Sequence, residues 1–241
     1  MNKINYQKEL DKITEGLWRD NHFPKLLLHA CCAPCSSYCL EYLREYFDIT
    51  LFYYNPNITD HDEYVKRVSE AKRLVNEYNK QVDTGNFDGM HTLGRARKID
   101  FLEGRYDSEA FLEAAKGLES CPEGAERCTK CFELRLMESA RVASGGNLLA
   151  AFEEQSQGEA RFDYFTTTLT ISPLKDAARL NEIGIQCGKK YGVDFLPSDF
   201  KKREGYKRSI ELSHMFDLYR QDYCGCGFSK AERMLEKEAK A

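Results

Sequence analysis

Ten cysteines dominate the chemistry available to this 241-residue chain, because nine of them fall into three groups. Cysteine thiolates bind zinc and iron, and paired thiols release two electrons when they close to a disulfide. The cysteine content is too low for a disulfide scaffold, and a chain of this length can bury a full core without one. The three reactive spacings are Cys31-Cys32-Ala33-Pro34-Cys35, Cys128-Thr129-Lys130-Cys131 and Cys224-Gly225-Cys226.

The first two groups together indicate a metal centre. Cys31 and Cys32 are neighbours, and a disulfide between neighbours would close a strained ring. Cys128 and Cys131 lie one turn apart at a predicted helix start, where the helix dipole favours thiolate. Four such thiolates suit a [4Fe–4S] cluster or a four-cysteine zinc site, and the spacing favours iron–sulfur. For the adjacent pair alone, two inert buried thiols are an equal alternative.

The third group has the spacing of a redox pair. A disulfide between Cys224 and Cys226 would span a single residue, and strained disulfides are easily reduced. Gly225 and Gly227 indicate unusual backbone geometry, which disfavours the alternative of two inert thiols near a turn. Cys35 is expected at the same strand end as Cys31, where it could bind a second metal. The cysteines expected only to pack are Cys39, Cys121 and Cys187.

Alternating strand and helix patterns predict a parallel α/β sheet that positions these thiols. The first cysteine group follows an apolar segment, and function in such sheets gathers at the carboxyl ends of strands. His29, just before it, is interpreted as a packed core histidine, with a supporting hydrogen-bond donor as the alternative. Strands are predicted at 25–28, 49–54, 162–170 and 193–196, with 81–84 as a further possibility. Helices are predicted at 4–19, 34–43, 61–79, 131–143 and 175–191.

The chain is interpreted as one α/β domain spanning residues 1–241. Within it, 1–24 is a helical extension, 86–127 is an insertion with one or two helices, and 201–241 is a helical segment carrying Cys-Gly-Cys. No internal repeat and no low-complexity run interrupts this pattern.

The composition excludes several classes of protein. Lys+Arg 35 against Asp+Glu 39 gives a net charge of −4, which indicates neither a general nucleic-acid coat nor a membrane anchor. A hydrophobic content of 42% is typical of a folded domain. No apolar stretch is long enough to span a membrane, and the first residues lack a secretory signal. We therefore expect a cytoplasmic protein, where clustered thiols are more often metal ligands or redox groups than structural bridges.

Five segments together resemble the cobalamin-independent epoxyqueuosine reductases. They are LLLHACCAPC (26–35), YYNPNI (53–58), ERCTKCFELR (126–135), FTTTLTISPLK (165–175) and YRQDYCGCGFS (219–229). The resemblance implies a Rossmann-like sheet of the adenine nucleotide α-hydrolase (HUP) type. It also implies reduction of epoxyqueuosine to queuosine at the wobble position of tRNA anticodons, the last step of queuosine biosynthesis.

The same resemblance implies the cofactors and their ligands. A [4Fe–4S] cluster would be held by Cys31, Cys32, Cys128 and Cys131, and Cys224 and Cys226 would form the redox-active disulfide. No cobalamin is expected, and a second iron or other metal near Cys35 remains open, as does a role for Cys35 as proton donor. ATP is not expected, because the first strand is followed by HACCAPC rather than a glycine-rich phosphate loop. The expected partners are tRNA carrying epoxyqueuosine and a low-potential electron donor, with no membrane and a monomeric chain.

Several charged residues are candidates for contacts with the substrate. Arg135 follows Cys131 by one helical turn and could neutralise an anionic cluster, and Lys175 could contact the cluster or the substrate. Tyr223, Asp222 or a thiol could donate protons. Basic runs that could bind tRNA phosphates, or simply form a solvated face, are Lys201, Lys202, Arg203, Lys207 and Arg208, with Arg95, Arg97 and Lys98 as a second set.

Other functions remain open from the residues alone. A zinc protein that binds RNA would use the same four thiolates without catalysis. A thiol–disulfide oxidoreductase would use CxxC without iron. An ATP-dependent tRNA sulfur-transfer enzyme is disfavoured by the missing phosphate loop.

Overall fold

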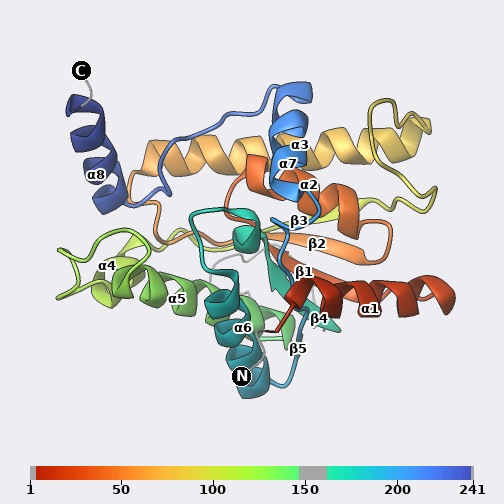
Figure 1. The fold of residues 1–241 in the computed structure, drawn as a ribbon, viewed down its shortest axis with the longest axis horizontal. Coiled ribbons are helices and arrows are strands. Elements are labelled where there is room, and N and C mark those ends of the chain that lie inside the picture. The colour runs from red at the N-terminus through yellow and green to blue at the C-terminus, as the bar shows by residue number, and fades with distance from the viewer. Residues whose placement is uncertain (1–3, 147–161, 240–241) are drawn as a thin grey trace.

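The computed structural model describes residues 4–146 and 162–239, which form a five-stranded sheet between two layers of helices (Figure 1). All four strand pairings are parallel, and the strand order is β3-β2-β1-β4-β5. This confirms the predicted α/β class. The strands are β1 (Lys25–His29), β2 (Asp48–Tyr53), β3 (Ile99–Glu103), β4 (Tyr164–Thr167) and β5 (Asp194–Phe195).

Eight α-helices connect and follow these strands within the described residues. Side-chain caps begin several of them: Asp60 accepts hydrogen bonds from the backbone at the start of α3, and Asp176 does so at the start of α6. Gly85 and Gly192 end the same two helices in the left-handed conformation. The helices are α1 (Tyr6–Arg19), α2 (Ala33–Leu43), α3 (His61–Thr84), α4 (Ser108–Ala114), α5 (Glu126–Ala143), α6 (Ala177–Tyr191), α7 (Gly205–Met215) and α8 (Gly227–Glu238).

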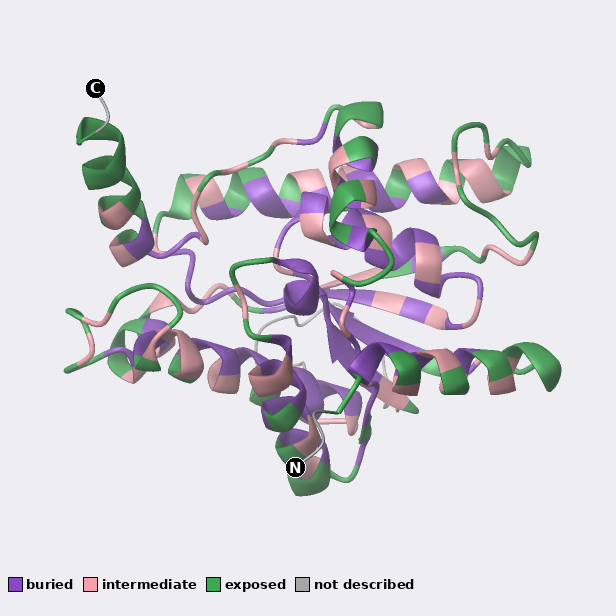
Figure 2. Cartoon of the chain, viewed as in Figure 1, coloured by how far each residue is buried: buried purple, intermediate pink, exposed green. Residues whose placement is uncertain are grey.

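The central strand β1 divides the core into two layers, which Figure 2 shows as buried ribbon between partly exposed helices. Leu26 and Leu28 pack with residues of α1, α2 and α3, whereas Leu27 points to the opposite layer with α5 and α6. All three side chains are completely buried, which stabilises the fold by about 2 kcal/mol each. A central strand buried on both faces places its carboxyl end deep in the molecule.

Two sequence expectations about the strands are wrong. Residues 81–84 do not form a strand but continue α3 to Thr84, where Gly85 ends the helix in the left-handed conformation. The remaining edge strand is β3, which lies inside the 86–127 segment expected to be an insertion. Its sequence, Ile-Asp-Phe-Leu-Glu, suits a half-exposed edge and therefore lacks the apolar run of a central strand.

The other boundaries differ by smaller amounts. The strand expected at 162–170 is β4, which passes at Thr168 into a short 3₁₀ helix ending at Ile171. The helix expected to begin at Cys131 begins at Glu126, so both cysteines of the CxxC spacing lie in the first turns of α5. No helix within the described ranges is long and apolar enough to cross a membrane.

Candidate redox site

The first thiol group lies at the carboxyl end of β1, where the chain turns into α2. Cys32 is the extended residue before the helix, and Pro34 lies in its first turn. The Sγ atoms of Cys31 and Cys32 are 3.8 Å apart, and those of Cys31, Cys32 and Cys35 all lie within 4.8 Å of one another. These three thiols could hold a metal ion, which supports the expectation that Cys35 shares the strand end.

The second and third groups meet across one cavity. Cys131 and Cys226 are buried in a small apolar cluster with Phe111, and Cys224 packs against its edge. The CxxC of α5 and the Cys-Gly-Cys before α8 are therefore neighbours, although almost a hundred residues separate them in the sequence. The cavity is lined by residues that include Cys128, Cys131, Cys224, Cys226, Arg135 and Lys175.

Two cations that line the cavity, Lys175 and Arg135, also lie close enough to Cys31 to affect its pKa. Hydrogen bonds from Cys32 and Cys35 lower the pKa of the Cys31 thiol well below its usual range, and the charges of Lys175 and Arg135 lower it further. Burial lowers the pKa of Lys175, but Cys31, Cys35 and Cys224 outweigh it and the pKa is raised. Among the described residues, neither cation forms an ion pair with a carboxylate. The site therefore favours a negatively charged group between the thiols.

His29 supports Arg135 from beneath. The imidazole is completely buried, which confirms the expected core histidine, and its Nδ1 lies 2.8 Å from the Thr167 hydroxyl. Burial, followed by the charge of Arg135, lowers its pKa to about 3, so the ring is neutral. Its Nε2 lies 3.2 Å from the Arg135 Nε and 3.1 Å from the Tyr54 carbonyl, and a neutral ring satisfies only one of them.

The Cys-Gly-Cys turn forms the start of α8. The Sγ atoms of Cys224 and Cys226 are 3.5 Å apart, and Gly225 has a φ of 114°. Ser229 closes the turn, because its hydroxyl accepts from the Cys224 amide and its amide donates to the Cys226 sulfur. A hydrogen bond from Cys226 is the main cause that lowers the pKa of Cys224, and Lys175 adds to it. The paired thiols thus favour thiolate at Cys224 and thiol at Cys226.

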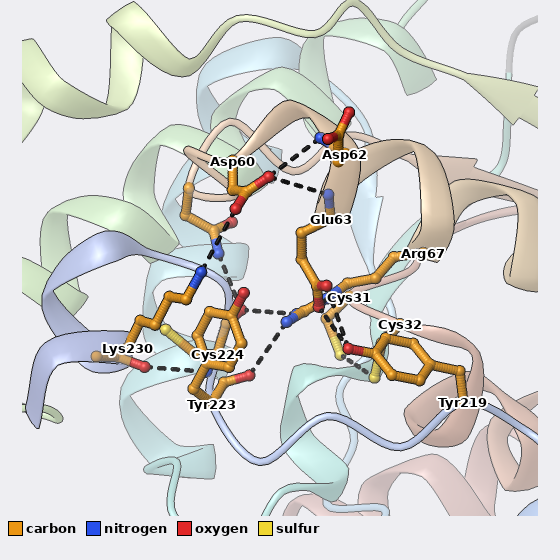
Figure 3. A network of polar contacts seen from close by, with 12 residues as sticks. Cys31, Cys32, Asp60, Asp62, Glu63, Arg67, Tyr219, Tyr223, Cys224 and Lys230 are labelled. Carbon is orange, nitrogen blue, oxygen red and sulfur yellow. Dashed lines mark hydrogen bonds and ion pairs between the residues drawn. The ribbon is translucent and has the colours of Figure 1, made fainter. Parts of the chain in front are cut away.

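Sequence reasoning missed the side chains that hold this turn. The Asn57 amide donates to the Cys224 carbonyl, and the buried Arg67 donates to the carbonyls of Cys224 and Tyr223 (Figure 3). Arg67 follows Tyr64 by three residues and precedes Ala71 by four, so it lies on the apolar side of α3. An arginine in such a position is the signal that could have found it.

Asn55, two residues before Asn57, contacts the part of the site around the end of β1 and Arg135. Its side-chain amide donates to the Ala30 carbonyl at the end of β1, and its oxygen accepts a hydrogen bond from Arg135. The turn after β2, Asn55-Pro56-Asn57, therefore reaches both the first thiol group and the Cys-Gly-Cys turn. In the sequence it is marked only as a turn.

The basic residues expected to bind tRNA are largely engaged within the fold. Arg208 forms an ion pair with Glu41 at 2.6 Å and is only 11% exposed. Arg203 pairs with Asp11, and Lys201 donates to the carbonyl of Lys175. Lys202 and Lys207 are exposed.

The second basic set is also engaged in the fold. Arg95 and Arg97 lie over the ring of Phe23. Lys98 forms an ion pair with Asp83 at 2.5 Å. Neither Arg95 nor Arg97 therefore extends freely into solvent, where it could bind a phosphate.

The remaining cysteines divide by burial. Cys39 and Cys187 are buried in the two core layers, which confirms the packing expected of them. Cys121 lies half-buried in the loop before α5, outside the core clusters of the described residues, so packing in a core is wrong for it. Cys32 and Cys35 also have the CxxC spacing, so the chain has two CxxC pairs. The spacing therefore favours iron–sulfur over zinc less strongly than expected.

Comparison with known proteins identifies relatives along nearly the whole chain. A family model described as epoxyqueuosine reductase QueH matches residues 26–232. Proteins named epoxyqueuosine reductase QueH from Staphylococcus epidermidis and Streptococcus pyogenes are 39% and 38% identical over 99% of this chain, covering 92% and 85% of their own lengths. The protein of that name from Thermotoga maritima is 31% identical over 89% of this chain and 94% of its own.

Proposed function

The chain belongs to the epoxyqueuosine reductase QueH family, and from this we propose how its thiols reduce epoxyqueuosine to queuosine. It is an oxidoreductase of queuosine biosynthesis. The proposed substrate is a cytoplasmic tRNA whose anticodon wobble base is epoxyqueuosine. Removing the epoxide oxygen leaves an alkene and water, and this takes up two electrons and two protons. The observation that carries the proposal is the shared cavity of Cys128, Cys131, Cys224 and Cys226.

A [4Fe–4S] cluster held by Cys31, Cys32, Cys128 and Cys131 fits the residues of the site. Its four thiolates make such a group anionic, which suits Arg135 and Lys175. Neither forms an ion pair with a carboxylate among the described residues, and Glu123 is the one carboxylate that lines their cavity. Bound there, the cluster would supply electrons one at a time from a low-potential donor. Arg135, held by Asn55 and beside His29, would fix a positive charge against the thiolates. Cobalamin has no part in this proposal.

Cys224 and Cys226 are proposed to be the two-electron pair. From the thiolate–thiol form, closing the pair to a disulfide releases two electrons and the Cys226 proton, and the second proton that the epoxide reduction requires would come from a cavity acid such as the Lys175 ammonium. The 3.5 Å separation of the sulfurs and the proximity of Cys131 and Cys226 support this role. A low-potential donor would reopen the disulfide for the next turnover.

Lys175 is the side chain best placed to act on the epoxide oxygen. It lines the cavity beside the Cys224 thiol, and its raised pKa keeps it an ammonium that can donate a hydrogen bond there. Asp222 is less suitable as a proton donor, since it lies at the surface with Lys237 at 2.5 Å. Tyr223 packs under Arg67 rather than lining the cavity.

Cys35 is proposed to support the metal site. Its thiol lies within 4.8 Å of Cys31 and Cys32, so it could hold a second metal or pass a proton. The same triad also favours a second candidate, a single zinc ion bound by Cys31, Cys32 and Cys35. Iron and sulfide analysis of anaerobically purified protein separates the two: about four irons per chain support the cluster, and one zinc without sulfide contradicts it.

The tRNA contacts are proposed on the exposed part of the basic run, Lys202 and Lys207, with Lys201 and Arg203 beside them. Lys201 donates to the carbonyl of Lys175, which places this run next to the cavity. Neutralising one phosphate-binding lysine should reduce the slope of log affinity against log salt by about one unit. Binding of tRNA to Lys202→Gln/Lys207→Gln, measured from low to high salt, checks this; Lys12→Gln on α1 is the control.

Product analysis tests the function as a whole. Reconstituted protein is incubated without oxygen with tRNA containing epoxyqueuosine and a low-potential reductant, and the nucleosides are analysed by mass. Conversion to queuosine, lower in mass by one oxygen atom, is the expected result. Absence of queuosine with a protein that holds its full iron would contradict the proposed reaction.

A further inference from the structure

Two arginines of α3 hold the chain that leads to the redox pair. The segment 216–224 runs from α7 to α8 alongside α3 (Figure 1). Arg73 donates to the carbonyls of Phe216 and Asp217 at its beginning. Arg67 donates to the carbonyls of Tyr223 and Cys224 at its end, at 3.5 and 3.3 Å. The segment is therefore bound at both ends by guanidinium groups from one helix.

Acidic residues of α3 also bind the segment 216–224. Glu63, Arg67, Glu70 and Arg73 together are called the docking strip. Glu63 accepts a 2.7 Å hydrogen bond from Arg67 and another from the Tyr219 hydroxyl (Figure 3). Glu70 forms an ion pair with Arg73 and accepts from the Tyr219 amide. Leu218 is the buried hydrophobic side chain of the segment. Phe216 also packs against the core beside Tyr78, so apolar contacts hold the start of the segment, and hydrogen bonds with α3 hold it from Tyr219 onward.

Arg67 is the member of the strip closest to the redox chemistry. It is only 2% exposed, and its guanidinium carbon lies 5.0 Å from the ring centre of Tyr223. A methyl group added at Gly225 would lie 3.1 Å from its Nη1, so the arginine also packs against the turn itself. Arg67 binds the backbone just before Gly225 and fills the space beside it. It therefore restricts the conformations that the Cys-Gly-Cys turn can adopt.

We propose that Arg67 is a positioning residue that keeps the Cys-Gly-Cys turn ready to form its disulfide. The inference rests on the redox role proposed for Cys224 and Cys226. With the turn held, the sulfurs lie 3.5 Å apart and closure orders little additional backbone. Without the guanidinium, the dithiol form samples more conformations and the disulfide becomes less favourable. Lysine cannot replace it, because a single ammonium does not bind a carboxylate and two carbonyls in this planar arrangement.

The test measures the thiol–disulfide equilibrium of the anaerobic, iron-loaded full chain in glutathione buffers. Each disulfide that opens takes two electrons and two protons from two glutathione thiols, which leave as one glutathione disulfide. After quenching and alkylation, the tryptic peptide of residues 221–230 reports the state, since it contains Cys224 and Cys226 and no other cysteine. We expect Arg67→Lys to shift the equilibrium about tenfold toward the dithiol, equal to ~30 mV, with its iron content unchanged.

Arg73→Lys is the matched control. Arg73 lies on the same helix, pairs with a glutamate and binds two carbonyls of the same segment, but it holds the end remote from the thiols. Its variant should stay within about twofold of the wild type. Asn57→Ala, which removes the other side-chain donor to the Cys224 carbonyl, should shift the equilibrium in the same direction as Arg67→Lys, and it replaces that variant if the latter does not fold.

The outcomes separate the positioning role from the redox role. If the wild-type peptide closes to a disulfide and Arg67→Lys closes at the same glutathione ratio, the positioning role is overturned while the redox pair stands. If the wild-type peptide never closes at any ratio, the redox pair fails and the role of Arg67 fails with it. A shift in Arg67→Lys that is absent in Arg73→Lys supports the proposal.

Discussion

The two ends of the site are held by different forces. The Cys31–Cys35 turn continues a strand that is completely buried from Leu26 to His29 between two core layers. The Cys224–Cys226 turn begins α8, a helix in which Ser229 is the buried residue and Met234 and Leu235 are exposed. The first is positioned mainly by apolar burial. In the second, Cys226 is buried, but Arg67 and Asn57 donate hydrogen bonds to the Cys224 carbonyl and Thr59 accepts one from the Gly227 amide.

This difference suits the roles proposed for the two turns. Metal ligands need a geometry that does not change, and displacing the Cys31–Cys35 turn would disturb β1 and the whole core. A disulfide must open and close, and the polar contacts of the Cys224–Cys226 turn are worth about 1 kcal/mol each. Such contacts allow local rearrangement without global unfolding. The comparison leads to four expectations.

Removing a proposed cluster ligand should have the largest effect. Cys131→Ser replaces a buried thiol that shares a cluster with Cys226, and we expect loss of bound iron and of all measurable turnover. Iron and sulfide content and queuosine formation check this. Cys187→Ser is the control, since it removes a buried core thiol that does not line the cavity and should lower stability by about 1 kcal/mol while keeping iron. Full iron in Cys131→Ser would remove that residue from the ligand set.

Breaking the redox pair should abolish turnover and spare the metal. Cys224→Ser and Cys226→Ser each replace a sulfur by a smaller oxygen in a turn that lies outside the two main core layers, so folding and iron content should match the wild type. Turnover should fall to background, because one thiol cannot close a disulfide. Multiple-turnover assays with tRNA check this. Loss of iron in both variants would make these cysteines part of the metal site and end the distinction between the two turns.

Distorting the redox turn should have an intermediate effect. In Gly225→Ala, the added methyl group would lie 2.8 Å from Ile58 at a φ of 114°, a strain of about 1–3 kcal/mol. We expect roughly tenfold slower turnover with iron retained. In the control Gly227→Ala, the methyl group would meet Thr59 at an ordinary 3.4 Å, and the rate should change little. Equal rates for both variants would show that the geometry of Gly225 is not required.

Weakening the strip at its far end should have the smallest effect. A hydrogen bond from Arg73, aided by the Tyr219 amide, lowers the pKa of Glu70 below its ordinary 4.5. This stabilisation is present above pH 4.5 and is lost as the pH falls toward the lowered pKa. Glu70→Gln should therefore be about 0.5–1 kcal/mol less stable at pH 7, and the difference should vanish in acid. Urea unfolding at several pH values measures it; a difference that does not vary with pH would contradict this electrostatic cause.

Much of the fold follows from local pattern. Leu26 to Leu28 and Leu51 to Tyr53 are apolar because parallel strands are buried on both faces, and such runs are visible in the sequence. β3 is not visible, because an edge strand needs neither a continuous apolar run nor strict alternation. The end of α3 is misjudged for a similar reason, since the residues near its end are polar.

By itself, the sequence determined how the thiols are spaced and therefore which chemistry we propose for them, because the spacings CC, CxxC and CGC are local and each limits what its sulfurs can do. Only the tertiary structure decided that CxxC and CGC share a cavity, that Arg135 and Lys175 have no described carboxylate partner, and that Arg208 is engaged by Glu41. It also revealed Arg67 and Asn57, whose importance lies in contacts to a turn more than 150 residues away. Spacing along the chain shows that Arg67 lies on the apolar side of α3, but which groups Arg67 and Asn57 contact depends on how the layers pack.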